Sequence, residues 1–286
     1  NVLPFLGEYS WSVVIASLVL AFCVAAVLIG GVKRIASVSQ IIVPFMAVIY
    51  IVFVLVLVVC NITAVPAAFA TIVKAAFSPK AITGGAVGSF LVAMQKGVAR
   101  GIFSNEAGLG SAPIAAAAAQ TKEPVRQGLV SMTGTFIDTI VICTLTGLSI
   151  VLTGAWQVDG LEGVQVTTYA FQNGLPLPKE LSAFVLMLCL VFFAFTTILG
   201  WDYYSERCLE YLSGGRMKYV KVYRWIYILA VFIGPYMTVS AVWTIADIFN
   251  GLMALPNMIA LFALSGVVVK ETKHFFERHR NGEIED

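Results

Sequence analysis

The sequence predicts an all-α polytopic membrane protein, and three observations lead to that fold class. Of the 286 residues, 59% are hydrophobic and only 12% are charged, and the mean hydropathy is +0.89. Soluble domains carry about 25% charged residues. Apolar segments long enough to cross a bilayer recur along the chain, and the number of basic residues between them alternates from loop to loop.

Seven segments reach the length of about 20 residues that a membrane-spanning helix needs. They are residues 10–31, 38–60, 86–118, 128–153, 180–204, 222–243 and 246–269, the third of them interrupted. Residues 64–78 and 157–176 are too short or too polar to span, and we expect extramembrane helices or hairpins there. Residues 1–269 are assigned to a transmembrane domain and residues 270–286 to a polar cytoplasmic tail that forms a frayed helix.

The basic residues lie mainly on one side of this alternation. That side collects Lys33, Arg34, Lys122, Arg126, Arg207, Arg216, Lys218, Lys221, Arg224, Lys270, Lys273, Arg278 and Arg280. The other side has only Lys74, Lys80 and Lys179, and Lys96 and Arg100 lie in the interrupted segment. Because cytoplasmic loops are enriched in lysine and arginine, the pattern predicts a C-terminus in the cytoplasm.

The interrupted segment carries the most informative stretch, residues 97–113, GVARGIFSNEAGLGSAP. A helix is predicted to end at Phe103, because glycines and backbone-competing side chains fill residues 104–110. A second helix is predicted to begin with Ser111 as N-cap and Pro113 in the first turn, followed by alanines at 115–119.

Such a break leaves unpaired carbonyls at one helix end and unpaired N–H groups at the other. An amino-acid zwitterion, or a small anion with a cation, matches these two ends. Asn105 and Glu106 are polar at membrane depth, which is typical of a transport pathway. The alternative is a kinked helix in which Gly97 and Gly101 allow close packing.

A second candidate site lies in residues 193–201, FAFTTILGW. The hydroxyls of Thr196 and Thr197 and the carbonyl of Phe193 are hard oxygen ligands that suit sodium. Trp201 lies four residues after Thr197, so the two share a helix face, where the indole can wall a small pocket or contact an ammonium. The alternative is that the threonines bond back to carbonyls of their own helix and that Trp201 is an interfacial anchor.

A third candidate is Asp138, inside the segment 128–153. It is expected to face the bundle interior with Thr135, Thr139 and Thr144, and to be partnered by Arg100, by Lys96 or by a polar network. Structural pairing and a role in an ion pathway are both open for this carboxylate.

Three further carboxylates lie at segment ends. We expect Asp202 and Glu206 to pair with Arg207 or to meet water near the cytoplasmic end of their segment. Asp247 lies at the very start of the last segment and is expected to lie at the membrane interface.

No signature of an enzyme is present: the sequence has no Walker loop, HExxH or GxSxG. A filter-like TVGYG run, as in potassium channels, is also absent. We therefore predict that the protein is not an enzyme, needs no cofactor and has no nucleic-acid partner.

The strings GVARGIFSNEAGLGSAPIAAAA, FIDTIVICTLTG and FTTILGWDYYSER closely resemble the alanine or glycine:cation symporter family, the sodium:alanine symporters of bacteria and archaea. The resemblance implies a ten-helix inverted-repeat fold of the amino-acid–polyamine–organocation superfamily, with alternating access around a midplane site. The seven segments are then similar to core helices 4 to 10, with 86–118 as the sixth, unwound helix and 180–204 as the eighth.

By this resemblance, the substrate contacts are Phe103, Ser104, Ala107, Thr197 and Trp201. The sodium site takes in Thr196 and Thr197, with the carbonyl of Phe193 as a third oxygen. The other unwound helix of the family is expected upstream of Asn1, so we expect the chain to be incomplete at its N-terminus and to carry half of the binding site.

These observations predict a multi-pass protein of the cytoplasmic membrane of a prokaryote that carries a small neutral amino acid, alanine or glycine, with sodium as the coupling ion. The runner-up is a proton-coupled permease of the same fold, with Glu106 or Asp138 as proton carrier. A membrane receptor for amino acids that does not transport, or a channel, is the alternative from another class.

Overall fold

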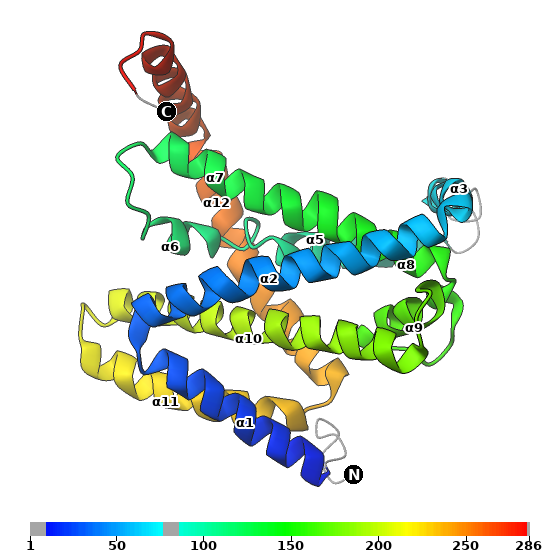
Figure 1. The fold of residues 1–286 in the computed structure, drawn as a ribbon. Helices are drawn as coiled ribbons and strands as arrows, with labels where there is room; N and C mark the ends of the chain where they lie inside the picture. The colour runs from blue at the N-terminus through cyan, green and yellow to red at the C-terminus, as the bar shows by residue number, and fades with distance from the viewer. Residues whose placement is uncertain (1–9, 77–85, 285–286) are drawn as a thin grey trace. The chain divides into compact units, whose positions relative to one another are not determined.

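The computed structural model describes residues 10–76 and 86–284, and every regular element in these residues is a helix (Figure 1). The all-α class predicted from composition is therefore confirmed for this part of the chain. The chain divides into two compact units, which are described one at a time. The first comprises Asn1–Phe77 and Thr144–Trp243, and the second comprises Ser78–Cys143 and Thr244–Asp286.

The first unit is organised around one long helix, α10. Its elements are α1 (Trp11–Leu28), α2 (Gly31–Cys60), η1 (Ile62–Ala64), α3 (Val65–Ala76), α8 (Cys143–Leu152), η3 (Ala155–Gln157), α9 (Val164–Gly174), α10 (Lys179–Leu212), α11 (Met217–Ile233) and η4 (Gly234–Tyr236). Helices α1, α2, α9 and α11 all pack against α10. The helix that carries the predicted sodium residues therefore contacts four other helices of this unit.

Apolar side chains join α1, α2 and α10 in a buried core. Val24 and Leu28 of α1 pack with Ile35 of α2 and Leu199 of α10. The turn that brings α1 and α2 together depends on Gly31, whose φ of 72° is in the left-handed region that glycine adopts without steric cost.

The far end of α2 is fixed by a side-chain amide. Asn61 donates from Nδ2 to the carbonyl of Leu57, at 2.8 Å, and to the carbonyl of Gly174 at the end of α9, at 2.9 Å. A Cβ on Gly174 would lie 2.8 Å from Leu57. A glycine is therefore required where α9 ends against α2.

The second unit contains the interrupted segment. Its elements are α5 (Ala86–Ser104), α6 (Ala112–Ala116), α7 (Pro124–Phe136), the π-helical segment η2 (Ile137–Ile142) and most of α12 (Val239–Arg280). Helix α12 has 42 residues, so no break separates the last predicted span from the polar tail, and the expected frayed tail helix continues α12 as far as Arg280.

Five helices in the described residues are long and apolar enough to cross a membrane, whereas the sequence predicts seven spans. They are Trp11–Leu28, Gly31–Cys60, Pro124–Leu152, Lys179–Leu212 and Val239–Arg280. The other two predicted spans correspond to α5, which is interrupted after 19 residues, and α11, which has 17. The boundary between the last two predicted spans is wrong, because the chain breaks at Gly234–Tyr236 and residues 239–245 belong to α12.

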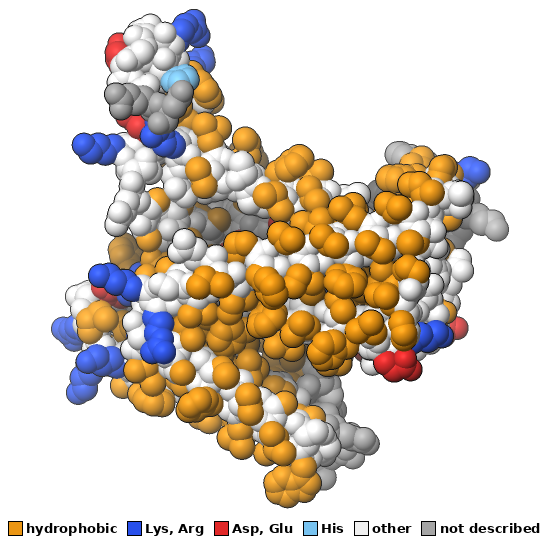
Figure 2. Space-filling model, in the orientation of Figure 1, with side chains coloured by type: hydrophobic (Ala, Val, Ile, Leu, Met, Phe, Trp, Pro, Cys, Tyr) orange, Lys and Arg blue, Asp and Glu red, His pale blue; other side chains and the backbone are white. Residues whose placement is uncertain are grey.

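Much of the surface of these helices is apolar. Figure 2 shows hydrophobic side chains over the visible faces of α1, α2 and α10 in the first unit. Phe22, Ile41 and Val191 belong to these helices and are all more than half exposed. A soluble monomer rarely exposes so large an apolar area. These surfaces suit contact with lipid.

The ends of the first unit differ in charge. The α1–α2 turn and the α10–α11 turn lie at the same end (Figure 1), and basic side chains gather there (Figure 2). The sequence places Lys33 and Arg34 after the first turn, and Arg216 and Lys218 at the second. Within this unit, the arrangement agrees with the alternation predicted from the sequence.

Candidate functional site

The predicted break in the third segment is present in the second unit. Helix α5 ends at Ser104, and the next helix, α6, begins only at Ala112. Between them, Glu106 has a φ of 58° and is the one non-glycine residue with positive φ in the described residues. Because a side chain in the left-handed region is uncommon and costs free energy, this loop is held by its surroundings.

The second helix of the break agrees with the prediction in part, because Ser111 is its N-cap residue and Pro113 lies in its first turn. Ser111 makes no capping hydrogen bond; its hydroxyl donates instead to the carbonyl and to Oε2 of Glu106, at 3.5 and 3.3 Å. The predicted run of helical alanines is wrong beyond Ala116, because Ala118 and Ala119 form tight turns to carbonyls three residues earlier. Alanine propensity alone does not sustain so short a helix without packing.

An amide of α12 holds the loop in place. Asn257 donates from Nδ2 to the carbonyl of Ala107, at 3.0 Å, and to the carbonyl of Gly108, at 2.9 Å. Gly110 has a φ of 77° and lies so close that a Cβ on it would be 2.9 Å from Oδ1 of Asn257. The amide therefore supplies the donors that two backbone carbonyls of the broken helix lack.

A polar network joins the end of α5 to the π-helical segment. Ser104 donates from Oγ to Oδ2 of Asp138 at 2.6 Å, and Asn105 donates from Nδ2 to Oγ1 of Thr139 at 3.1 Å. Of the partners considered for Asp138, the polar network is confirmed. A π-helical turn is rare and is found frequently at functional sites.

Arg100 has a different partner from the one considered in the sequence. Its guanidinium donates to both carboxylate oxygens of Asp247, at 2.8 and 3.3 Å. Asp247 therefore lies inside α12 as half of an ion pair. The side chain of Lys96, the other basic partner considered for Asp138, lies outside the described residues, as does Lys80.

In the first unit, the hydroxyl of Thr196 bonds back to its own helix. It is 3.0 Å from the carbonyl of Phe192 and 3.2 Å from the carbonyl of Phe193, as the alternative to the sodium site anticipates. The same geometry brings the Thr196 hydroxyl and the Phe193 carbonyl together, and these are two of the three oxygens predicted to bind sodium. Thr197, the third, is exposed.

Trp201 lies one turn beyond Thr197, half-buried, with its ring edge-on to Tyr204 at 5.9 Å. Phe103, Ser104 and Ala107, the other predicted substrate contacts, belong to the second unit, as do Asn105, Glu106 and Asp138. The residues predicted on α10 therefore lie in the first unit, and those predicted around the broken helix lie in the second unit. That both sets line one cavity stays a prediction.

The carboxylates near the end of α10 do not pair as expected. Glu206 accepts from Nε and Nη2 of Arg224 on α11, at 2.6 and 2.9 Å. Arg207 pairs with Glu210 instead, and Asp202 is 1% exposed rather than in contact with water. The predicted pairing of Asp202 and Glu206 with Arg207 is wrong because Arg207 projects toward Glu210 and the ring of Tyr203.

Two polar residues of the structure were not singled out in the sequence. Asn257 is an amide directly after Pro256 in the mostly apolar stretch 251–269 of α12, and an isolated amide in such a stretch was the signal available in the sequence. Tyr50 lies in α2, where its hydroxyl shares a hydrogen bond of 2.5 Å with Thr146 and its ring packs edge-on against Phe193. Nothing in its sequence context distinguishes Tyr50 from a packing residue.

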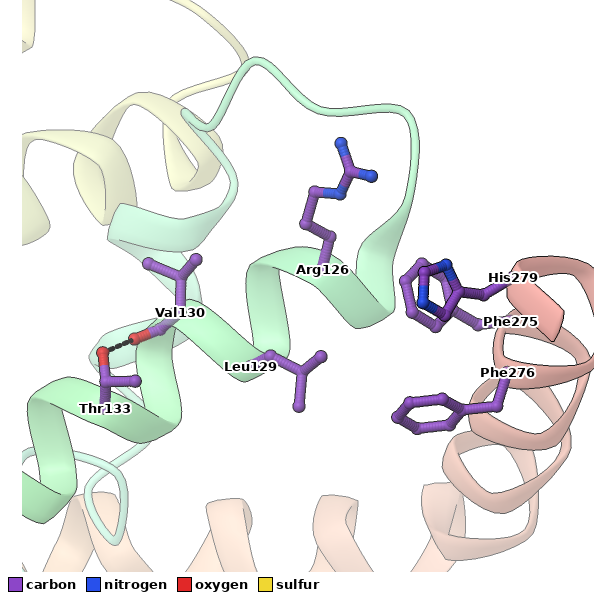
Figure 3. A pocket seen from close by; sticks show the side chains of 7 residues that line it. All are labelled: Arg126, Leu129, Val130, Thr133, Phe275, Phe276 and His279. Atoms are coloured by element: carbon purple, nitrogen blue, oxygen red, sulfur yellow. Dashed lines mark hydrogen bonds between the residues drawn. The ribbon is translucent and has the colours of Figure 1, made fainter. Parts of the chain in front are cut away.

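A pocket of about 430 Å³ lies between α7 and α12 in the second unit (Figure 3). Leu129 and Arg126 line it from α7, and Phe275, Phe276 and His279 from α12. The His279 ring stacks on Phe275 at 6.4 Å. None of the residues predicted to bind substrate or ion lines this pocket.

Comparison with known proteins decides the family. The profile of the sodium:alanine symporter family matches residues 4–286. The chain belongs to the sodium:alanine symporter family. The resemblance drawn from the broken-helix string is therefore confirmed, and the protein is a multi-pass membrane protein of a transporter family.

Individual relatives agree. The chain is 54% identical over 267 residues to an uncharacterized transporter of Haemophilus influenzae, and 49% identical over 270 residues to the sodium/alanine symporter AgcS of Methanococcus maripaludis. It is 38% identical over 280 residues to a probable sodium/glutamine symporter, GlnT, of Bacillus subtilis. These alignments cover 93%, 93% and 98% of this chain but only 58%, 58% and 57% of the relatives.

Proposed function

We propose that this protein carries a small neutral amino acid, alanine or glycine, across the cytoplasmic membrane of a prokaryote together with sodium, by alternating access in an inverted-repeat fold. The observation that carries the proposal is the break at residues 105–111 in an apolar helix, held by Asn257 and by the network at Asp138. Membership of the sodium:alanine symporter family supports the coupling ion and the substrate class.

The broken helix offers chemistry that suits a zwitterion. The last turn of α5 ends in carbonyls without helical partners, and the aligned peptide dipoles place partial negative charge there. A substrate ammonium fits this end, beside Phe103, Ser104 and Ala107. We assign the limit on the size of the substrate side chain to Phe103, Ala107 and Trp201, because aromatic side chains beside a bound amino acid would leave little room beyond a methyl group.

The sodium site is assigned to α10. The Thr196 hydroxyl and the Phe193 carbonyl already lie 3.2 Å apart, so two hard oxygens are presented from one helix turn. Thr197 adds a third when its hydroxyl turns toward them. Sodium stabilises one state of the transporter, and the substrate is coupled to it because both ligands favour the same state.

The first prediction tests the ion. With the protein expressed from its complete gene and placed in proteoliposomes, an inward sodium gradient should drive concentrative uptake of labelled alanine. The double variant Thr196→Ala, Thr197→Ala should lower uptake at least tenfold and raise the sodium concentration for half-maximal rate, because two ligands are lost. Thr168→Ala, a threonine that bonds back to a carbonyl on α9, is the control. Uptake that does not depend on sodium and is unchanged in the double variant would contradict the assignment of the sodium site.

The second prediction tests the side-chain limit. Trp201→Ala should let valine and leucine compete with labelled alanine, because removing the indole opens the wall of the predicted pocket, while sodium dependence is kept. Trp156→Ala, an exposed tryptophan outside the predicted site, is the control. Competition by valine and leucine that stays as weak as in the unaltered protein would argue against Trp201 as part of the pocket.

A proton-coupled permease is the second candidate, because a relative from Bacillus sp. strain PS3 that is 34% identical is described as a sodium/proton-dependent alanine carrier protein. In this chain, Asp138 is the carboxylate placed next to the broken helix, through Ser104. Uptake driven by a proton gradient without sodium, and lost in Asp138→Asn, would favour this candidate over sodium symport.

A further inference from the structure

A cluster of polar side chains is enclosed between α10 and α11, and one of its members has no hydrogen-bond partner among the residues that the structure describes. Asp202 is 1% exposed, and Glu206, one turn later on the same helix, is 2% exposed. Neither carboxylate oxygen of Asp202 takes part in a hydrogen bond with any group in the described residues. Buried polar groups are nearly always hydrogen-bonded, so this carboxyl group requires a further interaction.

The neighbouring charges leave one negative charge in excess. Arg224 is bound through two nitrogens to the two oxygens of Glu206, and in that bidentate geometry the guanidinium is committed to one carboxylate. Two carboxylates then face one guanidinium when both are ionised. An isolated charge removed from water costs far more free energy than the neutral acid.

The other groups around the cluster do not supply the missing charge. Tyr227 donates its hydroxyl proton to the carbonyl of Ile198, at 2.8 Å, and Tyr223 lies against Tyr227 with the ring centroids 6.1 Å apart. The remaining ionisable residues on the helices packed against α10 are Cys23, Lys33, Arg34, Tyr50, Cys60, Tyr169, Lys218, Tyr219 and Lys221. All the lysines and arginines among them are exposed.

We infer that Asp202 is a proton-binding site, which holds a proton while the cluster is enclosed and releases it to water when the cluster becomes hydrated. A sodium ion requires a shell of several oxygen ligands, but the oxygens of Glu206 are held by Arg224 and the Tyr227 hydroxyl is bound to Ile198. A proton needs no such shell, because a single O–H bond to one carboxylate oxygen removes the charge.

The position of Asp202 connects this site to the transport cycle. It follows Trp201 directly and lies five residues after Thr197 on one continuous helix. Any movement of α10 against α11 changes both the enclosure of Asp202 and the placement of those residues. A proton that binds the enclosed state more tightly than the hydrated state shifts the equilibrium toward the enclosed state.

Infrared spectroscopy of the complete purified protein in lipid tests the site without any need for transport. A protonated carboxylic acid has a carbonyl stretch distinct from the bands of a carboxylate, and labelling aspartate with ¹³C identifies its source. We expect an aspartic acid band at neutral pH that is lost in Asp202→Asn. Asp159→Asn, which removes an exposed aspartate of the same unit, should keep the band. A folded Asp202→Asn protein with an unchanged band would overturn the inference.

If Asp202→Asn does not fold, the conservative variant Asp202→Glu tests the proton site instead. It keeps a carboxyl group, so the acid band should remain but no longer respond to the aspartate label. A band that still shifts with labelled aspartate in this variant comes from another residue and overturns the inference.

The second readout rests on the proposed function. Sodium-driven uptake by the unaltered protein should depend on pH, whereas uptake by Asp202→Asn at acidic and alkaline pH should differ by less than about twofold. An unaltered pH profile in Asp202→Asn would contradict a role in transport. Failure of sodium-driven uptake in the unaltered protein would instead count against the proposed function, and the infrared result would still decide the proton site.

Discussion

Replacing Asn257 with leucine is expected to abolish most uptake while leaving the protein folded. The amide supplies donors to the carbonyls of Ala107 and Gly108, and each hydrogen bond stabilises the loop by about 1 kcal/mol. Leucine has a similar volume but no donor, so the loop loses about 2 kcal/mol of preference for this conformation. Uptake of labelled alanine in proteoliposomes should fall by about tenfold or more, since 1.4 kcal/mol corresponds to a factor of ten.

Asn250 provides the matched control on the same helix. Its Nδ2 has no hydrogen-bond partner in the described residues, so Asn250→Leu removes an amide without removing a loop contact. Both variants should elute as single, monodisperse species in detergent. Equal uptake by Asn257→Leu and Asn250→Leu would show that the amide of Asn257 does not hold the loop in a transport-competent conformation.

The break itself could be predicted because its cause is local. Four glycines and Pro113 lie within residues 97–113, and the penalties for such residues in a helix depend little on the rest of the chain. What holds the break open could not be predicted in the same way. Asn257 is 150 residues away from Ala107, and no periodicity connects an amide on one helix with a carbonyl on another.

The helix boundaries show the same division between local and distant causes. The sequence contained a local signal for the end of α11, because Gly234 and Pro235 form the turn that follows it. The continuous hydropathy of residues 222–243 hid that signal. The π-helical segment at Asp138 has no such signal. A π-helical turn depends on how side chains pack around it, and here Ser104 and Asn105 bond to its residues from another helix.

The candidate ion site was predicted by residue type and only partly by geometry. The adjacent threonines are the reason this turn of α10 is proposed as an ion site, but the sequence could not decide whether their hydroxyls face a ligand or their own helix. Thr196 turns to carbonyls of its own helix, because a buried hydroxyl donor without another acceptor takes the nearest backbone oxygen. If sodium binds here as proposed, these oxygens become its ligands and the ion replaces one hydrogen bond.

Breaking the ion pair between α10 and α11 is expected to have the largest effect on stability. In Arg224→Met, the Glu206 side chain stays buried, with 3% of it exposed, but its carboxylate loses the two guanidinium nitrogens that donate to it. Removing one partner of a buried pair costs about 3–5 kcal/mol. Because the Arg224 side chain is 19% exposed and water can reach part of the site, we expect about 3 kcal/mol, at the lower end of that range. The melting temperature in detergent should fall by several degrees.

The double variant Glu206→Leu, Arg224→Met tests whether the instability of Arg224→Met comes from the unpaired charge on Glu206. Replacing both members by apolar side chains of similar volume is often neutral or stabilising, so the double variant should regain most of the lost melting temperature. Arg207→Met is the control, since its partner Glu210 is about a third exposed and surface pairs contribute about 0–1 kcal/mol. If the double variant melts as low as Arg224→Met, the loss comes from the packing of the arginine stem between the helices, and the uncompensated charge on Glu206 is not its cause.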